Sequence, residues 1–172
     1  IPAEAEAAVA RTLARFGQLD ILIHLVGGFA PKLSVLETPL QAWQQLVSTN
    51  LFTTVVTCRA VIPAMQASGH GRIVTVAARA ALASGPGLGP FAAAKAGVLR
   101  LTETLAEELW PTINVNCVVP GTLDTPAARA ERPEADHARW IAPEAVAQAI
   151  LFLVSEEARG ITGVALPVLG NA

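Results

Sequence analysis

The sequence predicts an α/β fold built around a doubly wound parallel sheet. Short apolar runs rich in β-branched residues alternate along the chain with longer stretches of helical periodicity. The run at 20–26 is nearly continuous in apolar residues, as expected of a strand that is covered on both faces. Alternation of this kind predicts about four parallel strands with flanking helices and right-handed crossovers.

The element boundaries follow from local signals. Pro2 near the start and Gly17 just past the end delimit the first helix, and Pro63 lies near the end of the second. Strands are the short apolar runs between Gly- or Pro-containing loops. In chain order we expect a helix at 2–16, a strand at 20–26, a helix at 41–66, a strand at 72–77, a helix at 91–110, a strand at 112–119, a helix at 143–156 and a strand at 164–168. The loop 122–140 is long enough to cover a substrate.

Composition excludes several classes of function. The formal charge of −2 is spread along the chain without a basic stripe, so nucleic acid is not an expected partner. No continuous apolar run approaches the ~20 residues of a membrane span, so we expect a soluble protein. Cys58 and Cys117 lie far apart and lack metal or redox spacing, which indicates buried free thiols in a reducing compartment. Acidic residues near the start replace the basic ones of a secretory signal, so a cytoplasmic location is expected.

The strand at 20–26 predicts more sheet than the printed sequence supplies. It contains no Lys or Pro, and only His24 interrupts its apolar run before Gly27, so it is poorly suited to face solvent at a sheet edge. We therefore expect residues 1–172 to be a single truncated domain, completed either by further chain or by a second copy.

Phe91 and Lys95 form the most informative pair. They are four residues apart on a predicted helix, so both side chains lie on one face. A lysine in that position can lower the pKa of a tyrosine that protonates a carbonyl during hydride transfer. Phe91 itself has no proton to give. Alternatively, the two residues are a core aromatic and a solvated cation on an amphipathic helix.

The order and spacing of several motifs resemble the short-chain dehydrogenase/reductase family over nearly the whole chain. The family motifs written NNAG, Asn, Ser, YxxxK and PG fall here on five places: His24 to Gly27, Asn50, Ala78, Phe91 with Lys95, and Pro120 with Gly121. The resemblance implies a Rossmann-like fold, of which this chain carries the C-terminal part. It also implies an N-terminal βαβαβ half, roughly 60 to 80 residues at about 30 per unit, that the sequence lacks.

The same resemblance implies the site. NAD or NADP would be held by Gly27, Lys95, Pro120, Gly121, Leu123 and Thr125, with Leu123 acting through its backbone and Thr125 through its hydroxyl. The catalytic positions would be Lys95, Asn50, Phe91 and Ala78, with the backbone of Asn50 holding a water beside the lysine. Residues 123–126 with Arg129, Pro133, Asp136 and Trp140 resemble the dihydropteridine reductase branch, which lacks the serine but keeps its tyrosine.

Other candidate groups are weaker. The glycines at 85, 87 and 89 have the wrong spacing for a phosphate loop, and no acidic residue follows at the required distance. His24 is either a substitute acid or, more simply, a hydrogen-bonded structural histidine. His70 and His137 lack metal-ligand spacing and are expected at the surface.

Two functions remain open. The first is an NAD(P)-dependent oxidoreductase that reduces a small carbonyl or imine, with activity weakened by Phe91, Ala78 and the absent phosphate loop. The second is a non-catalytic scaffold that binds a ligand or a protein. The resemblance further implies a homo-oligomer that pairs through the helices 41–66 and 91–110.

Overall fold

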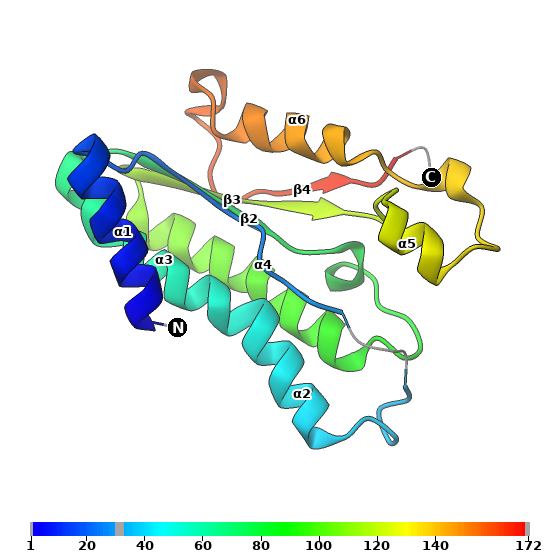
Figure 1. Ribbon diagram of the computed structural model, residues 1–172. Coiled ribbons are helices and arrows are strands. Elements are labelled where there is room, and N and C mark those ends of the chain that lie inside the picture. Colours follow the sequence, from blue (N-terminus) through cyan, green and yellow to red (C-terminus); the bar gives the residue numbers. More distant parts are fainter. Residues whose placement is uncertain (1, 30–32, 171–172) are drawn as a thin grey trace.

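Four parallel strands form the centre of the fold in the computed structural model, which describes residues 2–29 and 33–170. The strand order in the sheet equals the order in sequence, so each strand lies beside the next one in the chain (Figure 1). The expected α/β architecture is confirmed. The strands are β1 (Ile21–His24), β2 (Gly71–Val76), β3 (Ile113–Pro120) and β4 (Ala165–Val168).

Helices cover both faces of the sheet. One face carries α1 (Pro2–Phe16), α3 (Thr53–Ser68) and α4 (Gly89–Leu109), and the other carries α6 (Pro143–Leu153) (Figure 1). Alternation along the strands produces this division, because successive side chains point to opposite faces. Thus Ile73 and Val115 pack with the cluster under α3 and α4, whereas Val74 and Val118 pack with the cluster under α6.

One crossover has the hand opposite to that of the other two. The connections β1 to β2 and β2 to β3 run through helices on one face, but β3 to β4 runs through α6 on the other face while the strands advance in the same direction. Our expectation of uniformly right-handed crossovers is therefore wrong for the last one. The hand follows from the position of α6, which packs with Val74 and Val118 on the face opposite to α3 and α4.

Several element limits differ from those expected; the helix predicted at 143–156, for example, ends at Leu153. The strand predicted at 20–26 ends at His24, because the backbone of Gly28 is bonded to the side chain of Asn50. The helix 41–66 is divided into α2 (Leu40–Val47), a π-helical turn (Ser48–Phe52) and α3. The helix 91–110 begins two residues earlier, at Gly89. The loop 122–140 contains α5 (Pro126–Glu131) and a 3-10 turn (His137–Arg139).

The helical run Leu40–Ser68 bears on our expectation about membranes. Its 29 residues include an 18-residue window of mean hydropathy 1.3, so among residues 2–29 and 33–170 this is the one helical run that by length and composition could cross a membrane. The periodic apolar positions on its inner side, Cys58, Val61 and Met65, are buried against β2 and α4. That packing is typical of a core helix, which passes the same test.

The outer edge of β1 pairs with no strand in the described part of the chain. Ile21 and Ile23, which point to the α6 side, are 44% and 39% exposed, and Leu25 and Val26 beyond them are exposed as well. Long apolar edges are templates for another strand. That further chain or a second copy covers this edge remains a prediction.

Candidate active site

The carboxyl ends of β1, β2 and β3 lie at one edge of the sheet, where parallel α/β folds bind ligands (Figure 1). The residues expected to form the site follow these ends or lie on α4 beneath them. Gly27 follows β1, Ala78 follows β2, and Pro120 is the last residue of β3. The structure therefore brings the predicted positions to the expected edge.

Lys95 is buried beneath this edge. Its Nζ donates to the carbonyl of Val76 at the end of β2, at 2.9 Å, and the residue is 6% exposed. Burial lowers the pKa of the lysine. None of the described carboxylates forms an ion pair with it. Lys95 is thus a desolvated cation at the carboxyl edge of the sheet, and the alternative of a solvated surface lysine is wrong.

Gly27 is the point of closest approach between β1 and the buried polar groups. A Cβ at this position would lie 2.9 Å from Oδ1 of Asn50 and 3.1 Å from Nζ of Lys95. A side chain here would push both groups aside, so the absence of one keeps the amide and the ammonium close to the backbone. That Gly27 allows close approach of a cofactor remains a prediction.

Asn50 fixes that approach from the opposite side. Its Oδ1 accepts from the N–H of Gly28 at 3.1 Å, and its Nδ2 donates to the carbonyls of Gly28 (2.9 Å) and Leu46 (3.0 Å). The residue is fully buried in the middle of the π-helical turn, a local widening that is frequent at functional sites. Sequence reasoning predicted a backbone role for Asn50 and missed this side-chain clamp on the glycine pair.

Phe91 occupies the first turn of α4, one turn before Lys95. Its ring packs edge to face against Phe29, with 5.2 Å between ring centroids and an interplanar angle of 85°. Ala78 lies just after β2, has an extended backbone and precedes the 3-10 turn Arg79–Ala81. Neither Phe91 nor Ala78 can supply a proton or a hydroxyl group.

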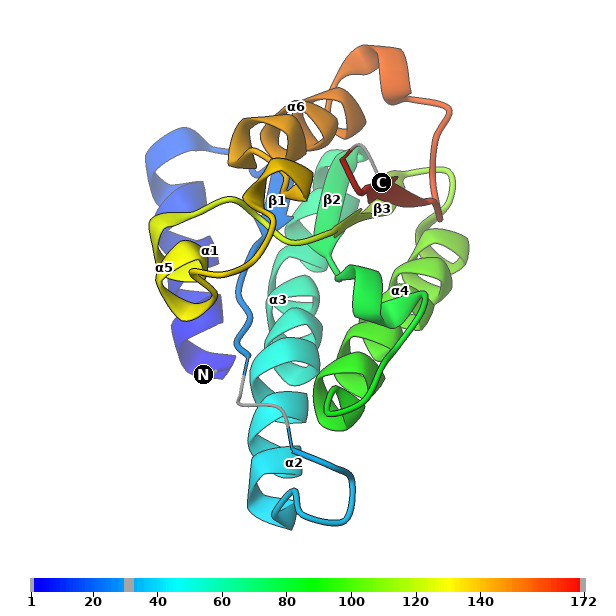
Figure 2. The ribbon, with the colours of Figure 1, turned by 90° about the vertical axis from the view of Figure 1, so that its right-hand side faces the viewer.

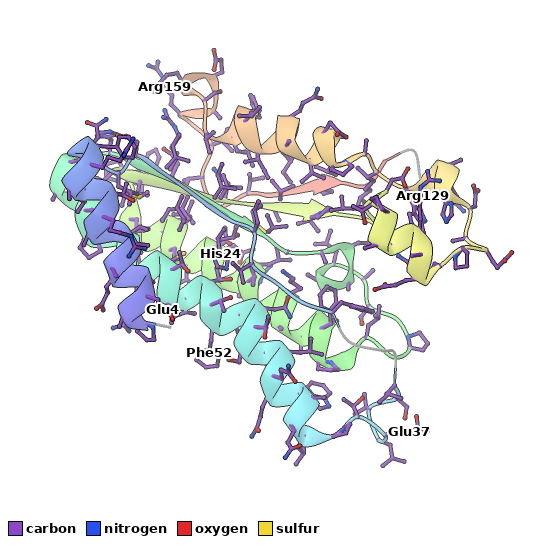
Figure 3. All side chains as sticks on the ribbon, in the orientation of Figure 1. Glu4, His24, Glu37, Phe52, Arg129 and Arg159 are labelled. Atoms are coloured by element: carbon purple, nitrogen blue, oxygen red, sulfur yellow. The ribbon has the colours of Figure 1, made fainter. Side chains whose placement is uncertain are left out.

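His24 is buried at the end of β1, between the sheet and the helices below it (Figure 3). Its Nε2 lies 3.4 Å from the hydroxyl oxygen of Thr53, and that hydroxyl donates its only proton to the carbonyl of Thr49 at 2.7 Å. Nε2 must therefore be the donor. Burial, and after it the charge of Lys95, lower the pKa of His24. This environment favours the structural interpretation over the substitute acid.

The pH dependence of stability tests that assignment. The folded protein keeps His24 neutral, whereas the unfolded chain titrates near pH 6.5. The stabilisation from His24 is present above about pH 6.5 and is lost as the pH falls through the lower folded-state pKa. Between about pH 7.5 and about pH 5 we expect the Tm of the wild type to fall further than that of His24→Asn, by thermal denaturation. Equal falls in the two proteins would argue against a buried neutral imidazole.

The residues expected on the cofactor side lie after β3. Pro120 pairs with Val168, and a Cβ on Gly121 would lie 2.9 Å from Cδ1 of Ile141, so that glycine is needed for packing. Leu123 forms an isolated parallel bridge with Ile141. In this bridge the N–H of Ile141 donates to the carbonyl of Thr122, and the N–H of Asp124 donates to the carbonyl of Ile141. Since alternate residues of an extended chain point to opposite sides, the N–H of Leu123 is directed away from Ile141.

Thr125 caps the helix α5, which the sequence did not predict. Its hydroxyl oxygen accepts from the N–H of Ala128 at 3.2 Å, which leaves the hydroxyl proton free for a ligand. The pair Thr125-Pro126, a capping residue followed by proline, is a helix-start signal that could have located α5.

Arg129 pairs with Asp124 within the segment 122–140, a contact that sequence reasoning did not predict although it named both residues. Arg129 forms two hydrogen bonds to the carboxylate of Asp124, one of them from Nη2 at 2.7 Å. This pairing lowers the pKa of Asp124. Figure 3 shows Arg129 projecting from α5 at the same end of the sheet. His137 donates from Nε2 to the carbonyl of Arg132 at 2.9 Å.

The remaining titratable candidates have structural roles. His70 is exposed and pairs with Asp20 at 2.7 Å, which raises the pKa of the imidazole. Cys58 and Cys117 are buried and unpaired, as expected, and burial raises the pKa of Cys58 to about 12. Among residues 2–29 and 33–170, no group of three or more His, Cys, Asp or Glu side chains could hold a metal ion.

Comparison with known proteins agrees with this geometry. A family model described as enoyl-(acyl carrier protein) reductase matches residues 2–170. Subunit BbsD of (2S)-((R)-hydroxy(phenyl)methyl)succinyl-CoA dehydrogenase from Thauera aromatica is 36% identical over 95% of this chain and 68% of the relative. The 3-oxoacyl-(acyl-carrier-protein) reductase FabG of Escherichia coli is 32% identical over 99% of this chain and 73% of its own length.

A solved structure gives the same result. Carveol dehydrogenase from Mycobacterium avium, in complex with NAD, superposes with a TM-score of 0.89 at 28% identity, covering 97% of this chain and 69% of its own. The resemblance inferred from the motifs, the parallel sheet with its buried lysine and these matches agree with one another. The chain belongs to the short-chain dehydrogenase/reductase family.

Proposed function

We propose that this protein is an NAD(P)-dependent oxidoreductase by descent that reduces a small carbonyl or imine, with activity weakened by Phe91 and Ala78. The observation that carries the proposal is the buried Lys95, whose ammonium lies beside Gly27 and Asn50 at the carboxyl edge of the sheet. Perturbed titratable groups in such crevices are typical of functional sites.

The residues present fit the nicotinamide end of a dinucleotide. The backbone of Gly27 lies close to the Lys95 ammonium and the Asn50 amide, the N–H of Leu123 is turned away from its bridge to Ile141, and Thr125 keeps a hydroxyl proton. These residues would hold the cofactor together with Lys95, Pro120 and Gly121. When bound, the cofactor supplies a hydride. Lys95 would orient it and place a positive charge near the developing alkoxide.

The described residues contain no glycine-rich turn after β1 that could hold the phosphates of a dinucleotide. Of the two glycines there, Gly28 is hydrogen-bonded to the side chain of Asn50, and Gly27 lies against that side chain. We propose that strands with such a turn pair with the free edge of β1. The exposed Ile21 and Ile23 support this.

Cofactor titration tests both the proposed binding of the dinucleotide and the proposed need for further strands beside β1. By NADPH fluorescence we expect no measurable binding to the 172-residue chain and saturable binding once a nucleotide-binding N-terminal half is fused before Pro2. Micromolar binding by the short chain would contradict the need for those strands. Failure of the folded fusion to bind would contradict the oxidoreductase proposal.

A second function is favoured by the missing acid. With Phe91 packed on Phe29 and an alanine at position 78, the fold could serve as a non-catalytic scaffold that binds a ligand or a protein. Activity separates the two proposals, because a scaffold binds its ligand without oxidising any cofactor.

We also propose a homo-oligomer that pairs through the helices 41–66 and 91–110, in the cytoplasm. The outward side of the helical run 41–66 carries Phe52, which is 58% exposed and projects away from the sheet (Figure 3). The unpaired thiols suit a reducing compartment.

Light scattering tests the assembly. Replacement of Phe52 by glutamate is expected to shift the mass from a dimer or larger species to a monomer, because a carboxylate cannot be buried unpaired at the interface. The matched surface change Phe16→Glu, on α1, is expected to leave the mass unchanged. A monomeric wild type would contradict the proposal.

A further inference from the structure

Arg79 is a cation at the carboxyl edge of the sheet that the proposed reduction does not use. It begins the 3-10 turn Arg79–Ala81, which follows β2 and is drawn in green between β2 and α4 in Figure 2. The N–H groups of Leu82 and Ala83 both donate to its carbonyl at 3.0 Å, and Ala81 packs against a core cluster formed by α4 and β3. The backbone of Arg79 is therefore fixed, while the residue stays exposed.

The guanidinium of Arg79 has no partner in the described part of the chain. It forms no ion pair, side-chain hydrogen bond or ring contact with any residue at 2–29 or 33–170. The sequence places no acid near it, since neither 21–36 nor 77–102 contains Asp or Glu. A guanidinium binds a carboxylate through two parallel N–H donors. Arg79 is thus available to an anion from outside the chain.

Lys95 makes this part of the edge more positive. Its Nζ is bonded to the carbonyl of Val76, which precedes Arg79 by three residues. The Cα atoms of Val76 and Arg79 are therefore at most about 11 Å apart. A buried ammonium and an exposed guanidinium lie close together here without a carboxylate between them in the sequence.

The acids of the other loops at this edge are engaged or distant. The carboxylate of Glu37 accepts from the hydroxyl of Ser34 at 2.6 Å, and that of Asp124 is bound by Arg129. The remaining acids of the segment 122–140 lie in α5 or beyond it, and Figure 2 shows α5 well apart from the turn Arg79–Ala81. The two cations are therefore not neutralised from these loops.

We propose that Arg79 selects a substrate that carries a carboxylate a few bonds from its carbonyl group, that is, a short oxo acid. The guanidinium holds the carboxylate, and the carbonyl lies beside Lys95. This inference rests on the proposed reductase site and specifies its substrate class. The phosphates of a dinucleotide do not account for Arg79, because the strands proposed to bind them pair with β1, whereas Arg79 follows the interior strand β2.

An NMR titration of the isotope-labelled 172-residue chain tests the proposal without any cofactor. The probe is levulinate, whose ketone and carboxylate are two methylenes apart. We expect saturable shifts centred on the amides of residues 77–81. Methyl levulinate has the same ketone without the charge and is expected to bind about fivefold more weakly, the effect of an exposed charge pair. Raising the ionic strength from about 0.05 M to about 0.5 M should reduce this difference.

Three variants assign the preference to one side chain. Arg79→Met removes the charge but keeps an apolar stem, and it is expected to bind levulinate and its ester equally. Arg79→Lys keeps the charge without the two-point geometry and should retain part of the preference. The matched control is Arg59→Met, at an exposed arginine on α3, which should retain all of it.

Three results would overturn the proposal. These are equal binding of levulinate and its ester by the wild type, an unchanged preference in folded Arg79→Met, or shifts centred away from residues 77–81. The reductase proposal is tested separately by cofactor binding to the fused chain, so the two can fail independently.

Discussion

Phe91→Tyr, made in a chain fused to a nucleotide-binding N-terminal half, is expected to raise the rate of cofactor oxidation by roughly 10²–10⁴-fold, the usual contribution of a positioned general acid. This corresponds to about 3–5 kcal/mol of activation barrier. The new hydroxyl would lie one helical turn from Lys95, whose ammonium already sits at the crevice without a carboxylate partner. A cation in that position favours the phenolate and lowers the phenol pKa toward the working range.

The measurement is the loss of reduced-cofactor absorbance with a panel of small ketones, aldehydes and imines. Phe91→Leu is the matched control, because it changes the same position without adding a hydroxyl, and it should give no gain. Phe91→Tyr with Lys95→Met should lose most of the gain, because the phenol then lacks its neighbouring cation. If the fusion binds cofactor and Phe91→Tyr gains nothing over Phe91→Leu, the scaffold proposal is favoured.

The parts of the fold that could be predicted are those with strong local periodicity. Continuous apolar runs located the four strands, and Pro2 with Gly17 delimited α1 at both ends, with Gly17 in the left-handed conformation at φ +78°. The opposite hand of the β3–β4 crossover left no local signal. It depends on which face of the sheet α6 covers, and that is decided by tertiary packing.

For the site, spacing predicted which residues meet but not how they are bonded. Lys95 and Phe91 were located by their four-residue separation and Gly27 by its place after a strand. The carbonyl of Val76 as the lysine's partner, and the packing of Phe29 on Phe91, join segments far apart in sequence. Contacts of this kind depend on the tertiary fold. The similarity of the segment 123–140 to the dihydropteridine reductase branch remains a prediction.

Asn50→Ala is expected to lower the free energy of unfolding by about 1–3 kcal/mol, because it leaves buried partners without hydrogen bonds. The side chain serves the N–H and the carbonyl of Gly28 and the carbonyl of Leu46. No other described side chain bonds to the backbone of Gly28, so the segment after β1 loses its attachment to the helix. Urea denaturation of the wild type and the variant gives the difference.

The control is Thr57→Val, on the same helical run. Thr57 donates only to the carbonyl of Thr53, one turn back at 2.8 Å, and that carbonyl keeps its helical partner. This variant should change the free energy of unfolding by less than about 1 kcal/mol. In the fused Phe91→Tyr protein, Asn50→Ala should also abolish the gain in turnover, since the Gly27 backbone is then free to move away from Lys95. Equal stability losses in the two variants, with turnover preserved, would show that Asn50 is an ordinary polar helix residue.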